Sequence, residues 1–303
     1  MKARASHNTM LGYPSSLRFQ INSGGRLVRR SARRLAQALR YRQFSFSGIP
    51  VLFANSFPKS GTHLLTQILA GFTQIGPAVD SGLPAVVTYD GFTGLQRPPD
   101  EILADLERLL PGDIAYGHVH ALPEIIDFLA RAPFAFYFIL RDPRDVVVSH
   151  VHYVTDMEPN HIHHPYYKDE LTSFAERLKV SIRGRPELAI DFPNIRQRFD
   201  PFMAWLDQPN VLTIHYEDFI LNRQAALGQV LDFAVRRGFP LQVGRQAALE
   251  TLESSIDPQR SPTFRSGKTG GWKDQFTEAH KELFKAVTGD LLIRLGYEQS
   301  HDW

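Results

Sequence analysis

The stretch that decides the fold is FANSFPKSGTHLL, residues 53–65. It follows Val51 and Leu52, and the apolar run at 51–54 is short enough to be a buried strand. The chain then turns through Pro58, Ser60 and Gly61. Apolar residues follow at the spacing of one helix face, at positions 64, 65, 68, 69 and 72. The sequence therefore predicts a strand, a tight turn and the start of a helix.

A turn of this kind can hold a phosphate or sulfate group. The first turn of a helix has free backbone N–H groups and the positive end of the helix dipole, and both favour an anion. Lys59 adds a charge, Ser60 and Thr62 add hydroxyls, and Gly61 lets the backbone come close to a ligand. His63 lies in the same turn of the helix. We expect these five residues to bind an anionic group.

The order of residues in this turn separates two kinds of phosphate loop. The P-loop of nucleotide triphosphatases has two glycines and places its lysine after the second. Here Lys59 precedes the glycine. The order PKSGT after a strand resembles the 5′-phosphosulfate loop of sulfotransferases that use 3′-phosphoadenosine 5′-phosphosulfate (PAPS). An ordinary turn with a helix cap is the alternative interpretation.

Composition limits the classes of protein to consider. The 303 residues suit one large α/β domain or two small ones, and 43% hydrophobic with 22% charged residues is ordinary for a globular chain. A net charge of +2 indicates no general nucleic-acid role. With no cysteine there is no disulfide and no thiolate metal site. We expect a cytoplasmic protein, since neither a transmembrane run nor a signal peptide is evident.

The N-terminal segment is basic. The first acidic residue is Asp80, whereas ten lysines and arginines lie within the first 42 residues. Residues 1 to about 24 read as flexible, and 25–43 as an amphipathic helix. Such a helix either packs on the domain surface or makes peripheral contact with an anionic membrane. We therefore expect a flexible basic segment at 1–45 and a sulfotransferase domain at 46–303.

Strands and helices alternate along the rest of the chain, which favours an α/β fold with a mostly parallel central sheet flanked by helices in a P-loop-like three-layer arrangement. Residues 134–140, FAFYFIL, are the best candidate for a central strand. Residues 73–100 read as a long loop, and Asp100 as the cap of the next helix. The other predicted strands are 113–118 and 211–216, and the other predicted helices are 100–110, 124–130, 173–183, 199–206 and 225–236.

The segment after the central strand reads RDPRDVVVS, residues 141–149. Ligands of α/β sheets bind at the carboxyl ends of the strands. The segment resembles the sulfotransferase 3′-phosphate motif, in which an arginine at the strand end and a serine eight residues later hold the 3′-phosphate. Arg141 and Ser149 stand at that spacing, and an arginine can grip a phosphate with two hydrogen bonds. A surface network of Arg–Asp pairs is the alternative.

Two further segments continue the resemblance. Tyr216 ends a predicted strand, where the family commonly has a tyrosine near the adenine. Residues 264–277, FRSGKTGGWKDQFT, resemble a loop that closes over the 3′-phosphate. Arg265, Ser266 and Gly267 align with its Arg-Lys-Gly trio, so one lysine is replaced. A dimer motif near residues 273–282 matches only in part, which leaves the oligomeric state open.

The resemblance implies a histidine base just after the second of the long predicted strands. Gly117-His118 directly follows that strand, so His118 is the first candidate and His120 the second. Ser149 is implied to engage Lys59 and restrain hydrolysis. Two departures are Tyr116 in place of a lysine and Leu64 in place of an adenine-stacking tryptophan. No metal is required, although the histidines at 161, 163 and 164 leave a metal site conceivable.

The activity implied is transfer of a sulfuryl group from PAPS to a hydroxyl or amine by in-line displacement, with Lys59 stabilising the leaving phosphate. The acceptor is a small molecule, a carbohydrate or a lipid, and its pocket is expected among residues 78–96, 118–125 and 155–170. The competing interpretations are a P-loop kinase, which the lysine order disfavours, and a non-catalytic nucleotide-binding or membrane-peripheral protein.

Overall fold

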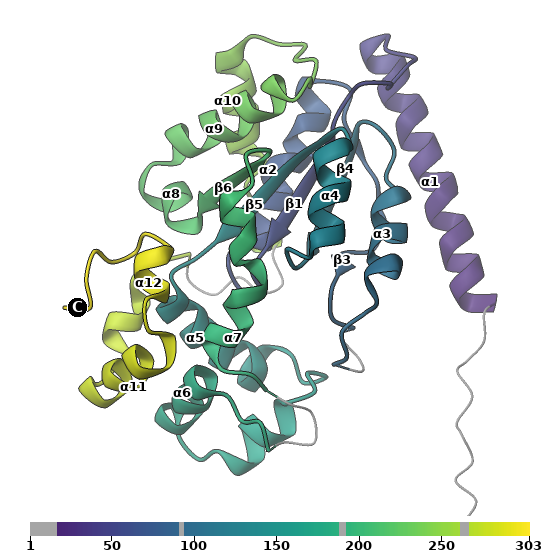
Figure 1. Cartoon of the computed structure of the whole chain (residues 1–303). Helices are drawn as coiled ribbons and strands as arrows, with labels where there is room; N and C mark the ends of the chain where they lie inside the picture. The colour runs from purple at the N-terminus through teal and green to yellow at the C-terminus, as the bar shows by residue number, and fades with distance from the viewer. Residues whose placement is uncertain (1–16, 91–93, 188–191, 261–266) are drawn as a thin grey trace, which may run out of the picture.

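The computed structural model describes the backbone of residues 17–90, 94–187, 192–260 and 267–303, and the side chains of these segments from residue 25 onward. Within these ranges, a parallel sheet is covered by helices on both faces (Figure 1). The fold predicted from the alternation of strands and helices is confirmed in this respect.

Strand β1 (Val51–Ser56) lies at the centre of the sheet. It pairs in parallel with β4 (Asp113–His118) on one side and β5 (Phe134–Leu140) on the other, and the path runs β2-β4-β1-β5-β6. Strand β6 (Val211–His215) pairs with β5, while β2 (Val79–Asp80) and β3 (Val86–Val87) both pair with β4. Every residue of β1 and β5 is buried, as their continuous apolar runs require.

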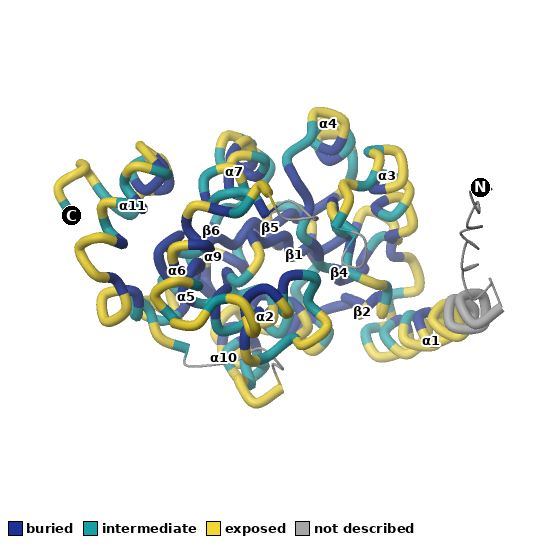
Figure 2. Tube along the Cα trace, turned by 90° about the horizontal axis from the view of Figure 1, so that it is seen from below, coloured by how far each residue is buried: buried dark blue, intermediate teal, exposed yellow. Residues whose placement is uncertain are grey.

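The two faces of the sheet are covered by different helices (Figure 2). On one face lie α3 (Pro99–Glu107), α4 (Pro123–Arg131) and α7 (Ile195–Phe199), and on the other lie α2 (Thr62–Ile75), α9 (Arg223–Arg236) and α10 (Arg245–Ser254). The remaining α-helices of the domain are α5 (Pro143–His152), α6 (Phe174–Arg183), α8 (Tyr216–Leu221), α11 (Glu278–Thr288) and α12 (Leu291–Arg294).

Each face of the sheet has its own apolar core, because side chains of a strand alternate between faces. Phe53 of β1 stacks on Phe136 of β5, with ring centroids 5.2 Å apart, and packs toward α3 and α4. Leu52 points the other way, toward α2 and α9. Burying β1 on both faces fixes the position of the turn that follows it.

Three local predictions were wrong. Residues 73–100 are not only loop, because they contain β2 and β3, which form by pairing with β4. Asp100 does not cap α3: Pro98 holds that position, and Pro99 begins the helix because its ring presets φ. The helix predicted at 199–206 is present as a 3₁₀-helix at Asp200–Asp207. Tyr216 begins α8 and does not belong to β6.

Helix α1 (Leu17–Tyr41) lies along one edge of the molecule (Figure 1), next to β2 (Figure 2). It starts inside the segment predicted as flexible and ends before Arg42, whose φ is +52°. Its apolar stripe is largely exposed, with Leu35 and Leu39 each 60% accessible. The helix is instead held against the domain by two arginines, since Arg30 and Arg34 both form ion pairs with Asp113 at the start of β4.

Helix α1 therefore packs on the domain through a buried ionic contact, although the division into segments 1–45 and 46–303 stays a prediction. In the part of the chain that the structure describes, the helices are all too short or too polar to cross a bilayer.

Candidate active site

A cleft of about 510 Å³ opens at the carboxyl ends of the central strands. Its walls come from the turn after β1, the end of β4, the end of β5, and α5 and α8, which are brought together because parallel strands end at the same edge of the sheet. The lining residues are Pro58, Lys59, Gly61, Thr62, His63, Leu64, Gln67, Tyr116, His118, Arg141, Ser149, Tyr153, Tyr216, Phe219, Ile220, Arg223, Ile256, Pro258 and Gly267.

The turn between β1 and α2 has an unusual backbone. Lys59 has a φ of +69° and Gly61 a φ of +101°, both in the left-handed region. For lysine this conformation is strained, and such strain gathers at functional sites. Gly61 is required for space as well, since a Cβ there would lie 2.6 Å from the Tyr216 ring. The predicted strand, turn and helix are therefore formed, with α2 starting at Thr62, while binding of an anion by this turn stays a prediction.

The Lys59 ammonium lies over the ring of Tyr153, with Nζ 3.8 Å from the ring centroid. Tyr153 was not predicted as a site residue. It stands four residues after Ser149, where α5 passes into a π-helix at Tyr153–Met157, so both side chains line the cleft. The i, i+4 spacing from Ser149 was the signal available in the sequence.

Arg141 extends from the end of β5 into the opposite side of the cleft. Its Nη2 donates to Asp145 at 3.1 Å and to the Lys268 carbonyl at 2.9 Å, and its guanidinium lies 4.8 Å from the Tyr216 ring centroid. Its Nε is buried and lacks a hydrogen-bond partner within the described part of the chain. An unpaired buried donor of a charged group is costly, so Arg141 is suited to receive an anion.

The glycine-rich segment after Gly267 is held against α5 by Asp145. The Asp145 carboxylate accepts hydrogen bonds from the backbone N–H groups of Gly270, at 2.8 Å, and Trp272, at 2.9 Å. Gly267 therefore reaches the cleft beside Arg141. Arg265 and Ser266, predicted in the same phosphate-binding trio, lie outside the described residues. Asp145 was missed as a positioning residue because its partners are distant in sequence.

His118 lies at the end of β4 and lines the cleft. Its Nδ1 is 2.9 Å from the Ser56 carbonyl oxygen and 3.1 Å from the Ser56 hydroxyl, which in turn lies 2.7 Å from the Thr62 hydroxyl. Because a carbonyl oxygen only accepts, Nδ1 carries the proton and Nε2 remains an acceptor. Burial lowers the pKa of His118, and the neighbouring charges of His63 and Lys59 lower it further. The neutral form is therefore favoured.

His120, the alternative base, has a different environment. Its ring packs against Phe202 at 4.7 Å and Tyr89 at 5.4 Å between centroids, and the residue is only 8% exposed. Burial lowers its pKa to about 4. It is absent from the lining of the described cleft. The geometry favours His118, and the sequence-based choice between the two stays a prediction.

His161 and His163 gather with His150 and Phe192 in an aromatic cluster, whereas Nδ1 of His164 lies 2.6 Å from the Val154 carbonyl oxygen. Within the described segments, no group of three His, Asp or Glu side chains has the arrangement of a metal site. Burial holds the pKa of His150 well below its usual value and lowers that of His161 to about 4. His150 and His161 therefore pack in their neutral forms.

The cleft suits a nucleotide with anionic groups at its polar end. Besides Arg141 Nε, the Ser60 hydroxyl is buried and unpartnered in the described structure. The opposite wall is apolar, with Leu64, Phe219 and Ile256. Lys59 and Arg141 thus face one cavity that also has a surface for a flat ring.

The sequence profile of the sulfotransferase domain family matches residues 136–296. The chain belongs to this family. The matched part includes Arg141, Ser149 and Gly267, whereas Lys59 and His118 precede it. A curated relative, sulfotransferase 6B1 of Danio rerio, is 22% identical over 259 residues, which is 80% of each chain.

Solved structures of sulfotransferases share the fold. Mouse sulfotransferase SULT7A1, complexed with PAP, is 19% identical with a TM-score of 0.54 over 89% of this chain and 93% of its own. Retinol dehydratase, in complex with androsterone and the inactive cofactor PAP, is 16% identical with a TM-score of 0.53 over 80% of each chain. This sulfotransferase therefore has the α/β fold of its family, as its motifs predicted.

Proposed function

We propose that the chain transfers a sulfuryl group from PAPS to a hydroxyl or amine of an acceptor. The observation that carries this proposal is the placement of Lys59, Arg141, Ser149 and His118 around one cleft at the carboxyl ends of β1, β4 and β5. When bound, PAPS supplies the sulfuryl group and a phosphate that leaves. The solved relatives that contain PAP support a nucleotide of this class.

Two sets of residues would hold the two phosphate ends of the donor. Lys59, the hydroxyl of Thr62 and the first-turn N–H groups of α2 suit the 5′ end, where negative charge grows as the S–O bond breaks. Arg141, Ser149 and Gly267 suit the 3′-phosphate, with Arg265 and Ser266 as predicted additions. The buried Arg141 Nε gains a partner in this way.

The cleft offers an apolar surface to the adenine, although Leu64 stands where many family members have tryptophan. Tyr216, Phe219 and Ile256 line the cleft together with Leu64. Tyr216 also packs against the phosphate turn at Gly61 and against Arg141. We infer that aromatic contact from Tyr216 and Phe219 replaces the missing tryptophan.

His118 serves as the general base in this proposal. Its Nε2 accepts the proton of the acceptor hydroxyl while the acceptor oxygen forms its bond to sulfur and the sulfur–phosphate oxygen bond breaks. The Ser56 carbonyl holds the proton on Nδ1 and steadies the imidazolium that forms. Tyr153 holds Lys59 toward the cleft, and Ser149 is the predicted partner of Lys59 that restrains hydrolysis.

The test is transfer of label from radioactive PAPS to a panel of hydroxyl and amine acceptors, with calorimetry of PAP binding beside it. Lys59→Ala should reduce kcat by about 100-fold or more because it removes a donor to the developing charge. Arg141→Ala should chiefly weaken PAP binding. Undiminished transfer by Lys59→Ala, or hydrolysis of Mg-ATP in place of PAPS turnover, would reject the proposal.

A further inference from the structure

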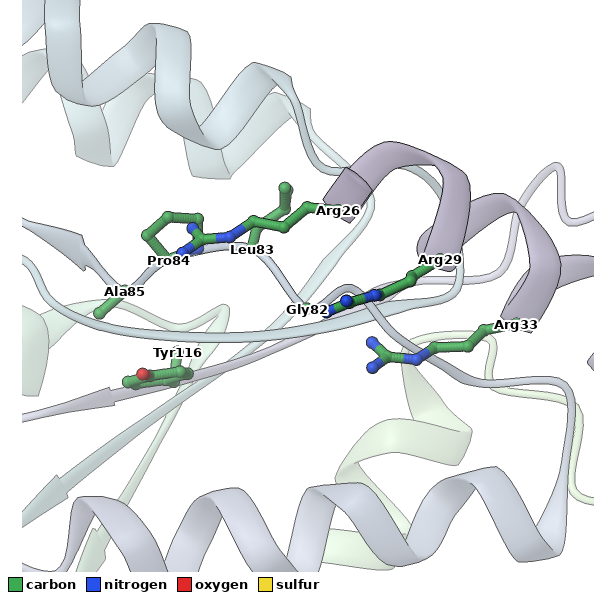
Figure 3. Close-up of a pocket in the computed structure, with 8 residues that line it drawn as sticks. All are labelled: Arg26, Arg29, Arg33, Gly82, Leu83, Pro84, Ala85 and Tyr116. Atoms are coloured by element: carbon green, nitrogen blue, oxygen red, sulfur yellow. The ribbon is translucent and has the colours of Figure 1, made fainter. Parts of the chain in front are cut away.

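A second cavity, of about 380 Å³, lies between α1 and the loop at 82–85 (Figure 3). Three arginines of α1, Arg26, Arg29 and Arg33, extend from the helix toward this loop. Gly82, Leu83, Pro84 and Ala85 form the facing wall, and Tyr116 of β4 contributes from the neighbouring strand. We call this cavity the arginine pocket.

The arginine pocket has an excess of positive charge. Arg33 is partly neutralised, since it pairs with the Asp80 carboxylate at 3.0 Å and donates to the Asp80 carbonyl at 3.0 Å. Among the described residues, neither Arg26 nor Arg29 forms an ion pair with an acidic side chain. The two guanidinium groups thus line one cavity with no counter-charge from the described residues, and such groups recognise phosphate, sulfate or carboxylate.

Ion pairs with β4 fix the position of α1, and hence of these arginines. Arg30 and Arg34 project from the same helix to the fully buried Asp113 of β4, while Arg26, Arg29 and Arg33 lie on an adjacent face. The ion pairs with Asp113 therefore fix the three arginines of the pocket in position relative to the domain.

Tyr116 joins the arginine pocket to the active-site cleft because it lines both cavities. Tyr116 and His118 stand two residues apart on β4, so their side chains leave the same face of the sheet, about 7 Å apart along the strand. The loop at 82–85 leads directly into β3, which pairs with Gly117 and His118. An acceptor at His118 could therefore reach the arginines past Tyr116.

We propose that the arginine pocket binds an anionic group of the acceptor, so that the preferred substrates are hydroxyl compounds that already bear a phosphate, sulfate or carboxylate. This inference rests on the proposed sulfotransferase function. The donor does not need these arginines, because Lys59 and Arg141 account for its two phosphate ends. The pocket adds selection among acceptors to the transfer carried out at His118.

The first experiment compares matched acceptors that differ only in the anionic group, such as glucose and glucose 6-phosphate, or phenol and 4-hydroxybenzoate. The Arg26→Gln/Arg29→Gln double variant should lose about tenfold or more of the kcat/KM for the anionic member. Its kcat/KM for the neutral member and its affinity for PAP should stay unchanged. Arg40→Gln is the matched control, because Arg40 lies on the same helix outside the pocket and stacks on Tyr41.

The outcomes of this comparison are distinct. The pocket is supported if the double variant loses the preference for the anionic acceptor while Arg40→Gln keeps it. An equal preference in wild type and double variant, or the same loss in Arg40→Gln, overturns it.

A second experiment does not depend on turnover, so it separates failure of the pocket from failure of the proposed function. With PAP saturating the cleft, modification of arginines by phenylglyoxal is followed by peptide mass spectrometry while inorganic phosphate is added. Phosphate should protect Arg26 and Arg29 but leave Arg40 reactive. If phosphate protects Arg26 and Arg29 but the protein transfers no sulfuryl group to any acceptor, the proposed function is rejected and the anion site is retained. If Arg26 and Arg29 react equally with and without phosphate, the pocket is overturned.

The same anion chemistry could come from a lipid headgroup, since α1 also exposes Leu27, Val28, Leu35 and Leu39. Sedimentation with phosphatidylcholine vesicles, with or without phosphatidylserine, distinguishes this source. Failure of wild type to bind either vesicle supports a free anionic acceptor. The opposite result would be binding of wild type to the phosphatidylserine vesicles, weakened in each of three variants: Arg26→Gln/Arg29→Gln, Arg40→Gln and Leu35→Ser/Leu39→Ser. This result would overturn the pocket in favour of a membrane-facing helix.

Discussion

The Ser56 carbonyl oxygen sets the chemistry available to His118. It lies 2.9 Å from Nδ1 and can only accept, so the lone pair of the imidazole is left on Nε2. Ser56 is the last residue of β1, and its hydroxyl also contacts Thr62 at the start of α2. The end of one strand therefore holds both the proposed base and the phosphate turn.

Replacement of the two candidate histidines should separate their roles. His118→Gln should lower kcat about 100-fold or more because the proton acceptor is lost. His120→Phe should leave kcat unchanged, because the phenyl ring can occupy the space between Phe202 and Tyr89. Steady-state rates with one accepted acceptor check this. Equal losses in both variants would contradict the assignment of His118.

The acid limb of the pH profile should reflect the lowered pKa of His118. A base must be unprotonated, and the fold favours the neutral ring, so the midpoint of the acid limb of kcat/KM should lie below pH 6.5. Measurement from pH 4.5 to 8 in wild type gives the position of the limb. A midpoint above 6.5 would show that His118 is not the titrating group.

Gly61 offers a test of the turn itself. An alanine there would place its Cβ 2.6 Å from Tyr216 and 3.2 Å from Ile139 while holding a φ of +101°. We expect Gly61→Ala to displace Tyr216, weaken PAP binding and lower the melting temperature. Gly270→Ala is the matched control, because its φ is also positive, at +73°, yet a Cβ there would have open space. Similar losses of PAP binding in both variants would argue against the steric reason.

At the scale of elements, ion pairs between side chains attach α1 to the sheet. Asp113 has no exposed surface and accepts from Arg30, Arg34 and the Leu110 N–H. Breaking a buried pair by removing one charge is far more damaging than losing a surface pair. The helix that carries the arginine pocket therefore depends on one carboxylate of β4.

Asp113→Asn should lower the free energy of unfolding by about 3–5 kcal/mol, because Arg30 and Arg34 lose their counter-charge. Asp80→Asn is the control, since the Arg33–Asp80 pair is exposed and should contribute about 0–1 kcal/mol. Denaturant unfolding of the three proteins gives both values. An Asp113 variant as stable as the Asp80 variant would show that the buried pair is not a net support of the fold.

Sequence patterns predicted the elements that depend on local signals. The apolar runs of β1 and β5 and the capping box at Ser173 and Glu176 are local, and α6 begins where predicted. Strands β2 and β3 have two residues each and depend on pairing with β4, so no local pattern reveals them. The order of strands is likewise a property of long-range contacts.

The candidate site divides in the same way. Lys59 and Arg141, which contiguous motifs predicted, line the cleft, whereas Asp145 accepts from backbone groups of Gly270 and Trp272, far along the chain. Packing of α1 on the domain surface was one of the two predicted alternatives, but the residues that make the contact were not predicted, for a related reason. Its apolar stripe suggested the buried face, but the contact is made by Arg30 and Arg34 with a distant aspartate.

The whole molecule buries several neutral histidines, which couples its stability to pH. Burial lowers the pKa of His120 and of His161 to about 4, and it lowers those of His118 and His150 as well. The unfolded chain binds these protons near pH 6.5, whereas the folded chain does not. Stability is therefore present above pH 6.5 and declines as the pH falls toward the folded values.

For His120 and His161, whose pKa values in the folded chain are about 4, the free energy of unfolding should fall as the pH drops from 6.5 to 5, with a slope that approaches about 1.4 kcal/mol per pH unit for each histidine. His120→Phe should reduce this slope by the contribution of one proton. Denaturant midpoints at several pH values measure the slopes. A wild-type slope of zero would contradict the burial of neutral rings.

The central strand β1 has a consequence for synthesis on the ribosome. Both of its neighbours, β4 and β5, come later in the chain, so β1 leaves the exit tunnel long before either can cover its edges. During that interval an apolar segment with open hydrogen-bonding edges is available to other nascent chains. Slow translation between residues 57 and 140 would extend this exposure, and chaperone binding to β1 would shorten it.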